Sequence, residues 1–238
     1  MVEKLIKTIT SARATFFCLL LLIFIFAMKP PSQNAQSSVK HYTYLALGDS
    51  YTIGEKVNAN ENFPTRVTII LKAKGFNFRK PEIVAQTGWT TDELHEAIIK
   101  AKLRGKYDFV TLLIGVNNQY RGKKVANYIP GFESLLNQAI QFASGDTTHI
   151  IVLSIPDWGV TPFAEGGDRK KISAEIDEYN AANKLIAEKY KVHYINITES
   201  TREAQKDPSL LTTDGLHPST KEYERWAKQV AEYMQSKL

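Results

Sequence analysis

The sequence predicts a single α/β domain in which a five-stranded parallel sheet lies between two layers of helices. Short apolar runs alternate along the chain with longer amphipathic segments, an order typical of parallel strands joined by helical crossovers. The length of 238 residues, with 43% hydrophobic and 23% charged residues, suits one sizeable globular domain. Neither a repeat nor a long low-complexity segment interrupts it.

The amino-terminal segment, residues 1–28, has the layout of a signal peptide. Lys4, Lys7 and Arg13 precede an uncharged apolar run over 16–28. That run is short for a bilayer span, which needs about 20 apolar residues. The small residues required by a cleavage site are poorly placed, so an uncleaved membrane anchor is the alternative. In either case we expect the domain to be exported, to the periplasm or outside the cell.

Residues 29–40 have the Pro- and Ser-rich composition of a linker, so the domain is expected over 41–238. The net charge of +5 is too small to indicate a nucleic-acid partner, and no cluster of Lys and Arg contains interleaved aromatics. Cys18, the only cysteine, lies in the leader, which excludes disulfides and thiolate chemistry from the domain. No His, Asp and Glu spacing resembles a metal site. We therefore expect neither a metal nor a cofactor.

The first strand is predicted over 43–47, where β-branched and aliphatic residues alternate, and Gly48 permits an abrupt turn after it. A helical pattern then occupies 62–75 and stops at a glycine. A second short strand is predicted over 82–85. The next helix begins at a capping box formed by residues 90–93, so the loop before it lies between a strand and a helix start.

The third strand, over 107–114, has the strongest strand pattern in the chain and ends at a glycine. A helix is expected over 125–143, followed by a fourth, buried strand over 150–153. The next connection, over 154–168, is long for a compact domain and contains several aromatic and Pro residues. Long connections of this kind often carry function.

The last elements are an amphipathic helix over 172–190, a fifth strand over 192–195 and a final helix. Ser219 and Glu222 have the spacing of a second capping box, which predicts the start of that final helix.

Ser50 follows the first strand directly, at the edge of the sheet where ligands bind in open α/β folds. A lone Gly-Asp-Ser is more often a polar turn. A serine nucleophile needs a base and a group that orients the base. Asp214 and His217, three residues apart on a turn, can supply both, although the same stretch could be a loop with a solvated histidine.

Two further positions suit the stabilisation of a tetrahedral oxyanion. Gly88, in a tight loop between strand and helix, can present its backbone N–H, and Asn117, after the third strand, can present its side-chain amide. Each has a structural alternative, as a turn glycine or a loop-closing asparagine. Four polar positions on one edge of a sheet nevertheless favour a catalytic site.

Taken together, these segments resemble the ordered sequence blocks of the SGNH, or GDSL-type, hydrolases, at 48–50, Gly88, 115–118 and 214–218. The resemblance implies a flavodoxin-like sheet with strand order 2-1-3-4-5 and ester hydrolysis without a metal. It also implies oxyanion donors from the N–H groups of Ser50 and Gly88 and from the Asn117 amide. The chain departs from the pattern at Tyr51, where the family name has Leu, and at Asn118, where Asp commonly follows the Asn.

The sequence therefore predicts an exported serine esterase that acts on a small-molecule carboxylic ester. An acyl lipid, a lysophospholipid and an acetylated carbohydrate are all compatible substrates. The aromatic residues expected at the site edge are either an acyl or glycosyl pocket or lids of the core, and they are Tyr51, Trp89, Trp158 and Phe163. The alternative from another class is a noncatalytic exported binding module on the same fold.

Overall fold

A computed structural model of the chain describes residues 40–103 and 105–238. The predicted leader over 1–28 and the predicted linker, apart from its last residue, lie outside these ranges. Among the helices of the described residues, none combines the length and apolar character that a bilayer crossing requires.

The sheet has five parallel strands in the order β2-β1-β3-β4-β5, which confirms the predicted fold class and strand order. The strands are β1 (Tyr44–Gly48), β2 (Glu82–Ala85), β3 (Phe109–Leu113), β4 (Ile150–Leu153) and β5 (His193–Ile195). Gly48 pairs with both Ala85 and Leu113. The first three strands therefore end at one level, and the loops after them start from a common edge.

Between the strands lie helices of very different lengths. The long ones are α3 (Phe63–Ala73), α4 (Thr91–Ala101), α6 (Val125–Phe142), α7 (Arg169–Lys189) and α9 (Thr220–Gln235). The short ones, none of them predicted, are α2 (Ser50–Ile53), α5 (Val116–Tyr120) and α8 (Thr198–Arg202). Single 3₁₀ turns are η1 (Thr147–His149), η2 (Trp158–Val160), η3 (Pro162–Ala164), η4 (Glu203–Gln205) and η5 (Pro208–Leu210).

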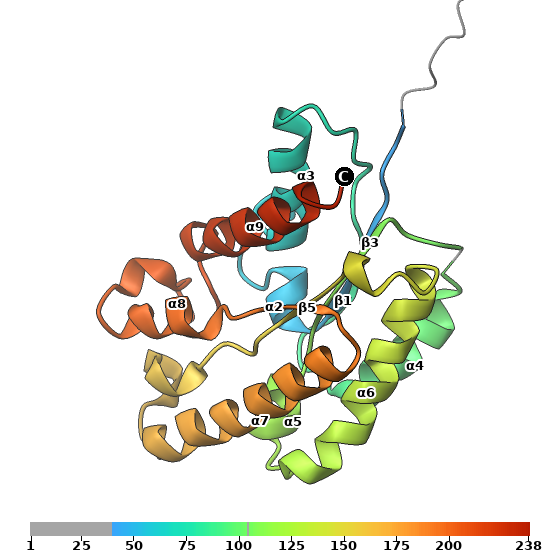
Figure 1. Ribbon diagram of the computed structural model, residues 1–238. Coiled ribbons are helices and arrows are strands. Elements are labelled where there is room, and N and C mark those ends of the chain that lie inside the picture. The colour runs from blue at the N-terminus through green and yellow to red at the C-terminus, as the bar shows by residue number, and fades with distance from the viewer. Residues whose placement is uncertain (1–39, 104) are drawn as a thin grey trace, which may run out of the picture. The chain divides into compact units, whose positions relative to one another are not determined.

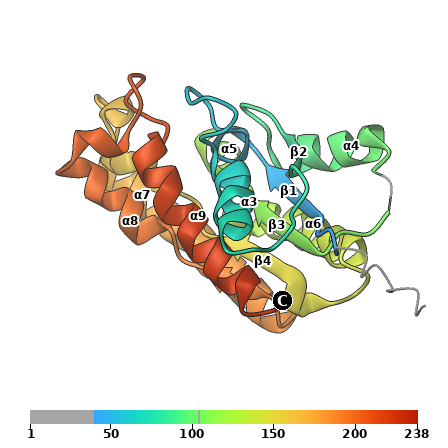
Figure 2. The ribbon, with the colours of Figure 1, turned by 90° about the horizontal axis from the view of Figure 1, so that it is seen from above.

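The helices form two layers. Helices α3 and α9 pack on each other and cover one face of the sheet, while α4, α6 and α7 cover the other (Figure 1; Figure 2). Every residue of β1, β3 and β4 is buried, which explains why these strands, apart from Thr111 in β3, do not alternate between apolar and polar residues. The described part of the chain thus has the predicted three-layer arrangement.

Gly48 is required by the close approach of α2 to β3. A Cβ atom at this position would lie 2.1 Å from Oγ1 of Thr52 and 2.4 Å from the carbonyl oxygen of Leu113. Because only glycine fits, the chain can turn from β1 into α2 without an intervening loop. Ser50 is consequently placed right at the end of the strand.

One of the two predicted capping boxes is correct and the other is wrong. The backbone N–H of Thr90 donates to the Glu93 carboxylate at 2.7 Å, as predicted for α4. At α9 the helix does start after Ser219, but Glu222 points inward. Its Oε1 accepts hydrogen bonds from Ser200 Oγ at 2.5 Å and Trp226 Nε1 at 2.7 Å. Ser200 from α8 and Trp226 one turn along α9 have thus replaced the backbone N–H of the cap as partners of Glu222.

Candidate active site

Ser50 is the first residue of α2, and Asp49 is its N-cap. Oδ1 of Asp49 accepts a hydrogen bond from the backbone N–H of Tyr51 at 3.0 Å, which fixes the turn. The N–H groups in the first turn of a helix have no intrahelical acceptor. Both the hydroxyl and the backbone N–H of Ser50 therefore lie at a helix start, beside the cleft described below.

His217 and Asp214 are brought together as their spacing predicts. Nδ1 of His217 lies 2.7 Å from Oδ2 of Asp214. The other carboxylate oxygen accepts hydrogen bonds from the backbone N–H groups of Leu216 at 2.9 Å and His217 at 3.0 Å, and from Thr212 Oγ1 at 2.8 Å. Partial burial opposes ionisation of Asp214, but these hydrogen bonds lower its pKa to about 2. The carboxylate is thus anionic at neutral pH and holds the imidazole in place.

The bond to Asp214 uses Nδ1 of His217, and Nε2 has no hydrogen-bond partner among the described residues, while the residue itself lines the cleft. The ring also packs against Tyr51, with the centroids 5.6 Å apart. Among the hydrogen bonds of the described residues, none joins Ser50 to His217. Such bonds between nucleophile and base are often long in free enzymes and shorten when substrate binds.

The two predicted oxyanion positions face the same cleft. Gly88 has φ +88°, in the left-handed region that favours glycine, and its carbonyl oxygen accepts a 2.6 Å hydrogen bond from Nη2 of Arg121. The amide nitrogen of Asn117 donates to the carbonyl oxygen of Trp89 at 2.9 Å. Because that nitrogen carries two hydrogens, one remains for a ligand.

Asn118, the departure from the usual Asp, makes specific contacts of its own. Its Oδ1 accepts from the backbone N–H of Thr91 at 3.1 Å, and its Nδ2 donates to Oγ1 of the same residue at 3.0 Å. Asn118 is 1% exposed and Thr91 begins α4. The amide therefore ties α5 to the start of α4 and satisfies both of its own polar groups.

These groups surround a cleft of about 190 Å³. Its lining consists of Ser50, Tyr51, Thr87, Gly88, Val116, Asn117, Tyr120, Trp158, Phe163, Leu216 and His217. It includes most of the predicted site residues, whereas Asp214 lies behind His217. No charged Asp, Glu, Lys or Arg side chain is part of this lining, so the cleft surface is apolar apart from a few uncharged polar groups.

The predicted aromatic residues take different places. Trp158 and Phe163 line the cleft with centroids 5.9 Å apart, and Tyr120, which the sequence analysis missed, packs 5.4 Å from Trp158. Tyr51 reaches the cleft but is only 2% exposed. The ring of Trp89 does not line the cleft, because it packs against the hydrophobic core.

Tyr120 could have been noticed three residues after Asn117, but only the tertiary structure shows that it meets Trp158. The loops of this wall are also joined to the histidine loop, since the backbone N–H of Phe163 donates to the carbonyl oxygen of Gly215 at 3.1 Å.

As for metals, residues 40–103 and 105–238 contain no group of three His, Cys, Asp or Glu side chains suited to hold an ion.

Solved structures share this fold. Axe2, an acetylxylan esterase from Geobacillus stearothermophilus, superposes with a TM-score of 0.64 at 20% identity, covering 81% of this chain and 94% of that one. TesA gives 0.63 at 19% identity, covering 82% and 99%. The psychrotrophic esterase EstA from Pseudoalteromonas sp. gives 0.60 at 17% identity, covering 82% and 97%. At these identities the likeness establishes the fold.

The family comes from the sequence. No curated protein matches the chain, but the GDSL-like Lipase/Acylhydrolase family matches residues 46–225, which is most of its length. The match begins within β1, just before Ser50, and ends in α9 after His217, so it spans every block that carries the resemblance. The chain therefore belongs to the GDSL-like lipase/acylhydrolase family and is a carboxylic ester hydrolase.

Proposed function

We propose that the protein hydrolyses its ester through an acyl-enzyme formed on Ser50. Ser50 Oγ attacks the ester carbonyl while Nε2 of His217 takes its proton, and His217 then protonates the departing alcohol. Water, deprotonated by His217, releases the acid. The observation that carries this proposal is the 2.7 Å contact between Asp214 and Nδ1 of His217, which directs the opposite ring nitrogen toward the cleft that Ser50 lines.

In the same proposal, the developing oxyanion accepts hydrogen bonds from the N–H groups of Ser50 and Gly88 and from the second N–H of Asn117. These donors follow three strands at one edge of the sheet, Ser50 after β1, Gly88 after β2 and Asn117 after β3. Hydrogen bonds between Asn117 and Trp89 and between Arg121 and Gly88 support the arrangement, because they hold two of the donor segments together before substrate arrives.

The substrate class that the cleft fits best is an ester with a short, uncharged acyl group. Its volume of about 190 Å³ is below the range of about 300 to 1,000 Å³ that holds drug-sized ligands. The absence of charged side chains from the lining also gives a phosphate headgroup no partner inside the cleft. An acetylated or other short-chain ester, including an acetylated carbohydrate, is thus favoured over a lysophospholipid.

We further propose that the enzyme is exported, on the basis of the basic and apolar leader over 1–28 and the linker after it. Cell fractionation with intact-mass analysis would distinguish a trimmed soluble form from an anchored full-length form. Full-length protein in the cytosol would contradict the export proposal.

Hydrolysis of a p-nitrophenyl ester series from acetate to palmitate, with acetylated sugars and lysolipids in parallel, tests the substrate proposal. We expect the highest kcat/KM at two to six acyl carbons. Ser50→Ala protein provides the background rate for each substrate. A maximum at long chains, or preference for lysolipids, would overturn the short-acyl assignment while leaving the serine mechanism standing.

A further inference from the structure

We propose that Arg202 is a positioning residue that fixes the aromatic wall of the cleft through an ion pair with the buried carboxylate of Asp157. This inference rests on the proposed function, because it assigns the wall a role in binding the acyl group. It concerns a part of the molecule outside the proposed triad. Arg202 lies on α8, and Asp157 immediately precedes Trp158 in the long connection after β4.

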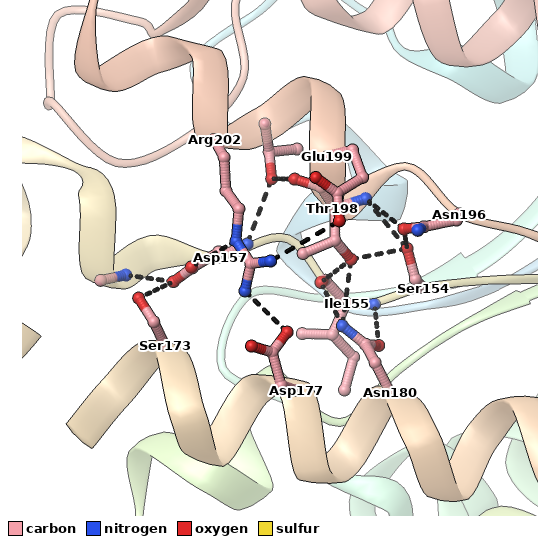
Figure 3. Close-up of polar contacts among 12 residues, drawn as sticks. Ser154, Ile155, Asp157, Ser173, Asp177, Asn180, Asn196, Thr198, Glu199 and Arg202 are labelled. Carbon is pink, nitrogen blue, oxygen red and sulfur yellow. Dashed lines mark hydrogen bonds and ion pairs between the residues drawn. The ribbon is translucent and has the colours of Figure 1, made fainter. Parts of the chain in front are cut away.

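The Asp157 carboxylate is completely buried and has a full set of partners. Oδ2 accepts from Nε of Arg202 at 2.9 Å, while Oδ1 accepts from the backbone N–H of Gly159 at 2.9 Å and from Ser173 Oγ at 3.0 Å. Figure 3 shows Arg202 reaching from α8 to both Asp157 and Asp177. Nη2 of Arg202 lies 2.6 Å from Oδ1 of Asp177, on α7. One guanidinium thus joins the loop to two helices.

The packing around this pair leaves the loop little freedom. A Cβ atom at Gly159 would lie 2.8 Å from Ser173 Oγ and 2.9 Å from the carbonyl oxygen of Arg169. The start of the loop is fixed separately, since the amide of Asn180 bonds both the N–H and the carbonyl oxygen of Ile155, at 2.7 and 3.0 Å (Figure 3). Asp157 and Arg202 therefore fix the position of the next segment, which contains Trp158.

Trp158 is held at its other end as well. Its Nε1 donates to Oε1 of Gln119 at 2.8 Å, and Nε2 of Gln119 donates to Glu175 on α7 at 2.7 Å. The indole has no further N–H to offer, so its contribution to the cleft is an apolar surface. Together with Tyr120 and Phe163 it forms a wall whose position depends on loop anchors rather than on the sheet.

The ion pair suits this role because breaking it has local consequences. A buried carboxylate without its partner is strongly unfavourable, so without Arg202 the loop has to move until water reaches Asp157. That movement displaces Trp158, whereas Ser50 is held at the start of α2 and His217 by Asp214, although the Phe163 end of the loop bonds Gly215. Loss of Arg202 should therefore weaken binding of acyl groups that reach the wall more than it weakens the chemistry.

The test compares Arg202→Met with the control Lys221→Met, which removes an exposed pair with Asp207 at 2.7 Å elsewhere on the surface. For p-nitrophenyl hexanoate we expect Arg202→Met to lower kcat/KM about tenfold, mostly through a higher KM, because each lost CH₂ contact weakens binding about fourfold. For the acetate ester we expect a change of less than about twofold. Lys221→Met should leave kcat/KM for both esters unchanged.

Because Arg202→Met leaves an unpaired buried carboxylate, the double variant Asp157→Asn with Arg202→Met separates the effect of that charge from the loss of the Arg202 contact. Because the charge that forces the loop to move is absent from the double variant, we expect its hexanoate-to-acetate ratio to change less than that of Arg202→Met. Acrylamide quenching supplies a readout independent of catalysis. The Trp158 contribution, obtained by subtracting the same protein carrying Trp158→Phe, should become more accessible in Arg202→Met, less so in the double variant, and not in Lys221→Met.

An equal fall in kcat/KM for both esters would overturn the proposal and leave Arg202 with a purely structural role. Unchanged kcat/KM for both esters together with unchanged acrylamide quenching would do the same. Wild-type protein that neither hydrolyses short esters nor is labelled at Ser50 would instead contradict the proposed function. The quenching comparison would still report on the positioning role in that case.

Discussion

Arg121 donates a 2.6 Å hydrogen bond to the carbonyl oxygen of Gly88, joining the end of α5 to the loop that presents one proposed oxyanion donor. The same guanidinium pairs with Glu93 at 3.3 Å. Two proposed donors, Gly88 and Asn117, are therefore held in register by side chains that need not touch substrate. Preorganisation of this kind is a large part of oxyanion stabilisation.

Replacing Arg121 with Met should lower kcat about 10- to 100-fold with little change in KM, because small displacements of a catalytic group are costly to rate. Arg121→Lys should recover only part of the loss, since an ammonium cannot reproduce the fork to Gly88 and Glu93. Lys123→Met is the matched control, because it removes a 2.6 Å pair with Asp92 close by in sequence. Equal kcat values in Arg121→Met and the control would refute the positioning role.

Asn117 offers a sharper test of the oxyanion site. A single donor of this type is typically worth about 10² to 10³ in rate. Asn117→Ala should therefore lower kcat by about that factor, keep a similar KM and still be labelled at Ser50 by a fluorophosphonate, more slowly. Asn117→Asp should be at least as damaging, because its charge repels the oxyanion. Wild-type turnover by Asn117→Ala would make the residue a loop-closing asparagine that bonds Trp89.

Asp214 should act through the tautomer it imposes on His217. In Asp214→Asn an amide N–H can face Nδ1, which then accepts, and Nε2 carries the proton and can no longer receive one from Ser50. We expect kcat to fall about 10³- to 10⁴-fold, while circular dichroism stays native. Asp214→Ala should lose less activity than His217→Ala, since an imidazole without its partner still functions when poorly oriented. A mild effect of Asp214→Asn would contradict this role.

The titration of Asp49 should make stability depend on pH with the opposite sign to that of most carboxylates. Burial, only partly offset by the bond from the Tyr51 N–H, raises the pKa of Asp49 to about 7, and its Oδ2 is buried with no hydrogen-bond partner among the described residues. The folded state therefore holds a proton that the unfolded state releases near pH 4, so stability is lost as pH rises from about 4 to 7.

Asp49→Asn removes this titration and can still accept from Tyr51 N–H. The free energy of unfolding of Asp49→Asn, relative to that of wild type, should rise by about 2 to 4 kcal/mol between pH 4 and 7 and then stay constant. Urea unfolding at pH 4.5, 6 and 8 measures the difference. A constant difference across these values would mean that Asp49 keeps an ordinary pKa.

The parts of the fold that could be predicted are those with a strong local pattern. Buried runs such as Ile150–Leu153 match β4 residue for residue, and the capping box at Thr90 marks α4 correctly. Helices α2 and α5 were missed because four or five residues carry no helical period. Yet these two short helices place Ser50 and Asn117.

The missed residues of the site have partners far away in the chain. Tyr120 packs against Trp158, which is distant in the chain, so no local pattern predicts the contact. Asp157 likewise pairs with Arg202 from a different part of the chain. Glu222 had the right spacing for a cap, but the Ser200 hydroxyl from α8 and the Trp226 indole one turn along α9 bind its carboxylate in the interior instead. In each case a tertiary contact decided the outcome.

Covalent labelling tests whether Ser50 is the nucleophile. Wild-type protein treated with a fluorophosphonate should gain the mass of one phosphonyl group, located on the peptide that contains Ser50. Ser134→Ala, which removes an exposed serine of α6, should label like wild type. Ser50→Ala should gain no mass and show no turnover above background, with unchanged thermal stability. Labelling of Ser50→Ala at the wild-type rate, or a wild-type adduct on another serine, would mean that a residue other than Ser50 is the nucleophile.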